Sequence, residues 1–153
     1  MTLLLAFLVG LFDGLRSFTA PAATAWAARL GWLKLERPLS LIESLPSVVI
    51  FTLAAAAELV VDKLPATPSR TAPPGLIARI LMGGLTGACI ASAGGSEAIA
   101  GALLGAAGGV VGCFGGHQAR VRLVRVLNKP DIYVALVEDI VAIAGSLWVV
   151  SRF

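Results

Sequence analysis

Charged residues are scarce in this sequence, and their scarcity excludes most soluble folds. Asp, Glu, Lys and Arg make up 14% of the 153 residues, whereas about a quarter of the residues in a soluble globular domain are charged. Hydrophobic residues make up 58%, and the mean hydropathy is +0.90. We therefore predict an all-α, polytopic membrane protein whose spans leave no room for a soluble domain.

Cysteine and histidine are also rare, with two cysteines and one histidine in the chain. Cys89 and Cys113 fall inside apolar runs and lack the spacing of a CxxC or Cys/His site, which argues against a structural disulfide or zinc. The phosphate-loop, HExxH and GxSxG patterns are absent. We expect no cofactor and no metal. An enzyme acting on a lipid stays open as a third possibility, since carboxylates and a histidine near an interface can perform acid–base chemistry.

The excess of basic residues is small and does not indicate nucleic-acid binding. The net charge is +3 and the pI is about 9.3. The basic residues sit in short loops beside apolar runs, where they typically determine membrane topology. We expect membrane lipids as partners and no nucleic acid.

The apolar runs predict one integral-membrane domain over residues 1–153, with a first span that is bent or interrupted near Gly14–Pro21. A cleaved signal peptide is not indicated, because no basic segment precedes the first run. Residues 29–44 alternate charges with Trp32 and leucines, as an interfacial amphipathic segment does. The proline-rich stretch 65–74 reads as a stiff linker. About five spans are predicted, over residues 2–28, 46–63, 75–93, 97–119 and 131–151.

Five spans would put the two chain ends on opposite sides of the membrane. Lys and Arg then number seven on the side of the N-terminus and four on the other. The positive-inside rule predicts a cytoplasmic N-terminus. The first set is Lys63, Arg70, Arg79, Arg120, Arg122, Arg125 and Lys129, and the second is Arg29, Lys34, Arg37 and Arg152.

Glu58 is the most informative residue, because it lies inside the apolar run 45–65. An ionised carboxylate at the centre of a membrane helix costs about 2.5 kcal/mol or more, so Glu58 should face protein or water. At about 1.5 Å per residue, Glu58 lies at nearly the same depth as Glu138 and Asp139 of the last span. The primary site candidates are Glu58, Glu138, Asp139, His117 and Arg120.

Two interpretations of these charges stay open. In the first, they form a site for a cation, a proton or a small solute in the cytoplasmic half of the membrane. In the second, they form structural ion pairs that hold spans together. Arg16 follows Asp13 by three residues and shares its helical face. The secondary candidates are Asp13, Arg16, Asp62 and Lys63.

Glycines repeat in the third and fourth spans at the small-xxx-small spacing of closely packed membrane helices. This spacing predicts helix packing and, since five short spans scarcely enclose a pathway alone, a homo-oligomer. The glycines are Gly83, Gly87, Gly101, Gly105, Gly109, Gly112 and Gly116.

Several of these segments together resemble a bacterial integral-membrane family known as domain of unknown function 4126. They are the Gly14-Leu15-Arg16 turn, the Glu58-x-x-x-Asp62-Lys63-Leu64-Pro65 helix end, the Gly115-Gly116-His117 run followed by Arg120, and Glu138-Asp139. The resemblance covers nearly the whole chain and implies a small bacterial inner-membrane protein. Because the family has no settled activity, the resemblance supplies no mechanism.

The residues themselves favour a small transporter or channel-like protein with a carboxylate-lined site. The alternative is a non-transporting scaffold or lipid-binding protein, in which the charges only clamp helices and the basic segment 120–129 contacts anionic head groups.

Overall fold

A computed structural model describes residues 1–63, 71–128 and 130–153 of the chain. These ranges contain six α-helices, one 3₁₀ helix and no β-strand, so the fold is all-α. Most of the predicted linker at 65–74, as well as Lys129, lies outside the described residues. The helices are α1 (Thr2–Leu15), α2 (Thr19–Arg29), η1 (Leu39–Glu43), α3 (Leu45–Val61), α4 (Pro73–Ala93), α5 (Ala98–Leu127) and α6 (Asp131–Val150).

Local sequence signals account for several helix boundaries. Ser44 caps α3 by accepting a hydrogen bond from the backbone N–H of Ser47. Pro73 and Pro74 open α4, where the missing N–H groups would have no helical partner. Asn128 ends α5 with a φ of 48°, a left-handed conformation that asparagine tolerates better than most residues.

Three helices are long and apolar enough to cross a membrane among the residues described: α4, α5 and α6. Two shorter apolar helices, α1 and α3, accompany them. The fold thus has the composition of a membrane protein, built from three long helices and two shorter ones.

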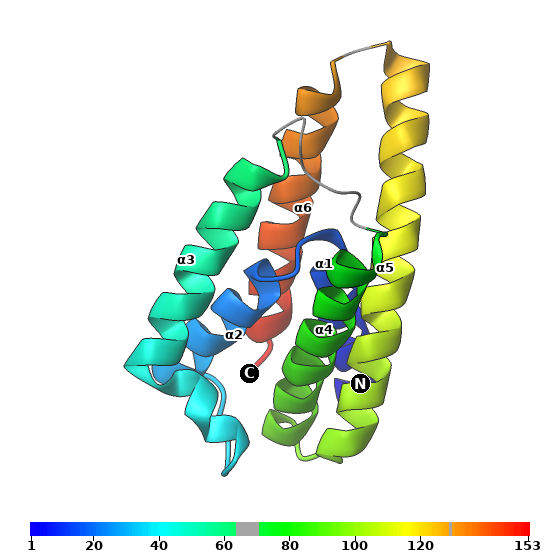
Figure 1. The fold of residues 1–153 in the computed structure, drawn as a ribbon. Helices are drawn as coiled ribbons and strands as arrows, with labels where there is room; N and C mark the ends of the chain where they lie inside the picture. The colour runs from blue at the N-terminus through cyan, green and yellow to red at the C-terminus, as the bar shows by residue number, and fades with distance from the viewer. Residues whose placement is uncertain (64–70, 129) are drawn as a thin grey trace.

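The first predicted span is two helices that turn back on each other. α1 runs in the same direction as α5, since Gly10 contacts Gly105 and Gly14 contacts Gly112. After a non-helical turn at residues 16–18, α2 descends beside α3 toward the end from which α1 started (Figure 1). The predicted interruption is present, and it reverses the chain, so that α1 and α2 form a helical hairpin.

This reversal brings both chain ends to the same end of the bundle (Figure 1). The apolar core confirms the arrangement, because residues near the start of α1 and the end of α6 pack together there. Leu33 and Ile42, from the predicted interfacial segment, join the same core. The expectation that the two ends lie on opposite sides rested on a single first crossing, which the hairpin replaces.

The glycines at the interface of α4 and α5 let the two backbones touch. A Cβ added at Gly105 would lie 2.0 Å from the carbonyl oxygen of Gly83, and one at Gly87 would lie 2.3 Å from that of Gly101. Only glycine fits such contacts, which are the close approaches that small residues permit in lipid. These glycines therefore pack within one chain. A Cβ added at Gly115 would meet nothing within 4 Å, and Gly116 lines a crevice described below.

Candidate functional site: a charged cluster at the hairpin tip

Arg16 lies at the centre of a cluster of charges at the tip of the α1–α2 hairpin. Its side chain is fully buried, and its backbone is extended, with φ −142° and ψ 114°. One guanidinium nitrogen lies 2.5 Å from Asp62 Oδ2, and two others lie 2.6 Å from Asp139 Oδ1. The end of α3 and the middle of α6 are thereby tied to the hairpin tip. A buried arginine with two carboxylates is the arrangement that compensates for desolvation of the charge.

Glu58 holds the backbone of the same tip. Its two carboxylate oxygens accept hydrogen bonds from the N–H groups of Ser17, at 2.8 Å, and Phe18, at 3.0 Å. These groups immediately precede α2, where N–H groups lack helical partners and the helix dipole favours negative charge. Pro21 is tolerated in the first turn of α2 for the same reason. Glu58 therefore acts as a cap supplied by another helix.

The cluster continues through Asp139, which is shared by two cations. Lys63 Nζ lies 2.6 Å from Asp139 Oδ2 and 2.6 Å from the carbonyl oxygen of Leu59. Asp139 thus faces Arg16 on one oxygen and Lys63 on the other. A change in the charge of this one carboxylate would act on both cations.

Arg120 of α5 forms the outer part of the cluster. It lies 3.0 Å from Asp62, 2.5 Å from Asp131 and 3.5 Å from Glu138. Because Asp62 also contacts Arg16, the outer and inner parts share this carboxylate. The result is one connected network that joins the hairpin tip with α3, α5 and α6.

Arg79 of α4 supports the tip from the opposite direction. Its Nε donates to the carbonyl oxygen of Gly14 at 3.0 Å, and a terminal nitrogen donates to that of Gly75 at 2.9 Å. The other terminal nitrogen lies 3.6 Å from Glu58. Arg79 thus occupies a carbonyl that the end of α1 leaves free, and irregular backbone is tolerated at membrane depth when protein satisfies it in this way.

The network joins a buried residue to an exposed one. The side chain of Arg16 is 0% exposed and that of Asp131 is 57%, and the cluster side chains in ion pairs between them are 9–22% exposed. The cluster is therefore largely shielded and reaches solvent at Asp131.

The structure brings most of the predicted site residues into this cluster and leaves two outside it. His117 is half-buried on α5, and no hydrogen bond or ion pair links it to the cluster within the described ranges. Asp13 is fully buried, and its hydrogen bond is to Thr86. The predicted residues that meet in the cluster are Glu58, Asp62, Lys63, Arg16, Arg120, Glu138 and Asp139.

Sequence reasoning missed Arg79, Asp131 and the two backbone N–H groups that Glu58 caps. The signal for Arg79 was available, since it is a charged residue inside an apolar run, as Glu58 is. Asp131 was hidden by its place at the start of a span, where an acid is usually only a favourable helix start. No sequence pattern indicates which backbone N–H groups a distant carboxylate will accept from.

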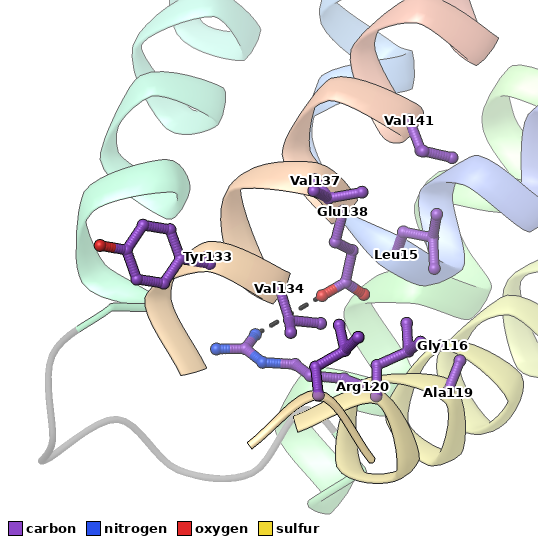
Figure 2. Close-up of a pocket in the computed structure, with 11 residues that line it drawn as sticks. Leu15, Gly116, Ala119, Arg120, Tyr133, Val134, Val137, Glu138 and Val141 are labelled. Carbon is purple, nitrogen blue, oxygen red and sulfur yellow. Dashed lines mark ion pairs between the residues drawn. The ribbon is translucent and has the colours of Figure 1, made fainter. Parts of the chain in front are cut away.

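The same region contains a crevice of about 400 Å³ between α5 and α6. Its walls are largely apolar, with Leu123, Val137 and Val141 among the lining residues. Figure 2 shows Glu138 of α6 and Arg120 of α5 among the lining residues, joined by an ion pair. One side of the ion-pair cluster thus borders an apolar space.

Metal-binding potential in the described part of the chain is limited. No group of three or more His, Cys, Asp or Glu side chains is arranged there to hold a metal ion. The carboxylates of the cluster contact arginine and lysine, with contacts such as Arg16 to Asp139 and Lys63 to Asp139. The carboxylates of the site therefore have basic side chains as their partners.

The fold and the cluster define a class, the all-α proteins of membrane-spanning type with an ion-paired polar site inside the helix bundle. Within that class the chain belongs to the family described as Domain of unknown function (DUF4126), whose model matches residues 3–151. No curated protein and no solved structure matches the chain.

Proposed function

We propose that this protein is a small bacterial inner-membrane transporter or channel-like protein, and that the cluster at the hairpin tip binds a cation, a proton or a small solute. The observation that supports the proposal is the turn between α1 and α2. Residues 16–18 are non-helical, and buried charges surround them. Broken helices of this kind occur in membranes where they line a substrate site or a path for ions.

The shared carboxylates suggest how the cluster would respond to a ligand. Asp139 is held by Arg16 and Lys63, and Lys63 is the more exposed cation. A cation that arrives from the solvent edge would compete with Lys63 for Asp139, and a proton on Asp139 would weaken its hold on Arg16. Either event loosens the hairpin tip, so the ion pairs would work as a gate.

The hairpin also changes the orientation that we propose. α1 begins and α2 and α6 end at one end of the bundle, next to Arg29 and Arg152, whereas α3 and α5 end at the other, next to Lys63, Arg120, Arg122 and Arg125 (Figure 1). The positive-inside rule then places that more basic end in the cytoplasm and the N-terminus outside. The charged cluster remains in the cytoplasmic half of the membrane.

Flux measurements in proteoliposomes test the transport proposal. We expect the purified protein to support a pH- or ion-dependent flux above that of empty liposomes, and Asp139→Asn to reduce this flux at least tenfold. The matched control is Asp131→Asn, because the side chain of Asp131 is 57% exposed at the edge of the cluster. This control should keep most of the flux.

Two results would contradict the transport proposal. One is the absence of flux in folded wild-type protein across a panel of protons, alkali cations and small solutes. The other is equal flux in wild type and Asp139→Asn when both show the same thermal stability. Either result would mean that the ion pairs of the cluster only hold the helices together.

The crevice between α5 and α6 favours the second candidate function, lipid binding by a non-transporting scaffold. An apolar space of about 400 Å³ with Arg120 and Glu138 at its wall suits an acyl chain whose head group lies near the charges. Native mass spectrometry should then show retained lipid, and Val141→Trp should remove it by filling the crevice. Ala144→Trp, which is not among the crevice-lining residues, is the control. The same spectra test the predicted homo-oligomer, because they report the oligomeric state.

A further inference from the structure

Asp13 is a buried carboxyl group that the ion-pair network does not use. Its side chain is 0% exposed, and it lies on α1 one turn before the hairpin tip. In the part of the chain that the structure describes, Oδ1 has no hydrogen-bond partner. An ionised carboxylate in such a place would be costly, because it is desolvated and none of the described residues forms an ion pair with it.

The hydroxyl of Thr86 shows how the other oxygen is satisfied. Thr86 Oγ1 lies 2.5 Å from Asp13 Oδ2, 2.9 Å from the carbonyl oxygen of Met82 and 3.2 Å from that of Gly83. A hydroxyl has one proton to donate. Asp13 Oδ2 and the two carbonyls therefore compete for one hydroxyl proton. If Thr86 donates that proton to a carbonyl, its contact with Asp13 is a hydrogen bond only when Asp13 carries a proton to donate.

Within the described residues, no cation forms an ion pair with Asp13. From α5, the helix facing this stretch presents the backbone of Gly105 beside Gly10 and of Gly112 beside Gly14, and the buried Cys113 follows Gly112. The only titratable side chain of α2 is Arg29, at its far end.

Charges at the tip reach Asp13 only from a distance. Glu58 of α3 and Arg79 of α4, which carry opposite charges, lie at the tip. Arg79 is already engaged with the carbonyl of Gly14 and with Glu58. From α6, Glu138 and Asp139 face Arg120 and Arg16. The surroundings therefore favour a neutral acid.

We propose that Asp13 is a proton-binding site, held as a neutral carboxylic acid that donates its hydrogen bond to Thr86 Oγ1. On release, the proton passes from the carboxyl oxygen to water that enters at the hairpin tip, and the carboxylate left behind accepts a hydrogen bond from Thr86. The further claim, that this proton is the coupling ion, rests on the proposed transport function. It would make the protein a proton-coupled transporter.

Infrared spectroscopy of the full chain in lipid nanodiscs tests the proton site. At neutral pH we expect a protonated carboxylic C=O stretch in wild type that is missing in Asp13→Asn and unchanged when sodium chloride replaces choline chloride. Thr86→Val should shift the same band to higher frequency, because the acid loses its hydrogen-bond acceptor. This second variant keeps the test valid if Asp13→Asn does not fold.

Three results would overturn the proton site. They are the absence of any such band in wild type, a band that survives in folded Asp13→Asn, and a band that disappears on addition of sodium, which would mean a cation site. A separate flux measurement tests the coupling. If the band is present but wild type shows no flux, the transport function fails and the proton site stands. If flux is present and folded Asp13→Asn retains its pH dependence, the coupling claim fails.

Discussion

At the scale of single residues, glycines and charges perform separate tasks. Gly83, Gly87, Gly101 and Gly105 bring α4 and α5 into backbone contact, and that contact places Thr86 of α4 within reach of Asp13. The charged side chains meet beyond Asp13, at the hairpin tip. Packing therefore determines where the polar groups lie, and the polar groups then hold the turn.

A methyl group at Gly105 tests the packing. Gly105→Ala should lower the free energy of unfolding by about 1–3 kcal/mol, as overpacking does, because the new Cβ would lie 2.0 Å from the carbonyl oxygen of Gly83. Gly115→Ala in the same helix is the control, because its new Cβ would meet nothing within 4 Å. Thermal or denaturant unfolding in detergent measures both. Equal losses in the two variants would mean that the contact does not limit packing.

Sequence reasoning identified the charged residues of the cluster because charges inside apolar runs stand out. It could not assign their partners, since these depend on which helices become neighbours. Glu58 illustrates the difference: it was expected to face protein or water, but the sequence did not indicate that its partners would be backbone N–H groups about 40 residues earlier in the chain. Thr86 gave no signal at all, because a threonine in an apolar helix is ordinary.

At the scale of elements, the α1–α2 hairpin depends on groups supplied by other helices. The turn leaves the N–H groups at the start of α2 and the carbonyls at the end of α1 without hydrogen-bond partners in their own helix. Glu58 accepts from the former, and Arg79 donates to the carbonyl of Gly14. The predicted interruption near Gly14–Pro21 was therefore correct in place. Its direction was not predictable, since a break in a helix specifies neither a bend nor a reversal.

Removing the charge of Glu58 should loosen this turn. A hydrogen bond to a charged group contributes about 1.5–3 kcal/mol, so Glu58→Gln should raise the amide hydrogen-exchange rate of Ser17 and Phe18 at least tenfold. Glu97→Gln is the control, because Glu97 is exposed at the start of α5 and makes no side-chain cap. Unchanged exchange at the tip in folded Glu58→Gln would show that the turn is held by packing alone.

At the scale of the whole molecule, one reversal changes the topology of everything that follows it. The composition predicted an all-α membrane protein, and the described residues form only helices, three of them long and apolar enough to cross a membrane. The motifs indicated the family, and the family model matches residues 3–151. The count of five spans treated residues 2–28 as one crossing. Apolar length cannot distinguish a crossing from a hairpin whose two halves have the same combined length.

The central claim is that residues 2–29 enter the membrane and return on the same side, and thiol labelling in cells tests it most directly. Single cysteines would replace Thr2, Leu30 and Asn128 in a Cys89→Ala, Cys113→Ala background, and a membrane-impermeant maleimide would be added to intact spheroplasts. We predict that Thr2→Cys and Leu30→Cys are labelled from outside, and that Asn128→Cys is labelled only after lysis. If Asn128→Cys is labelled from outside, and Thr2→Cys and Leu30→Cys only after lysis, the hairpin stands with the opposite orientation in the membrane. Labelling of Thr2→Cys and Leu30→Cys from opposite sides would contradict the account, because the first two helices would then cross the membrane once.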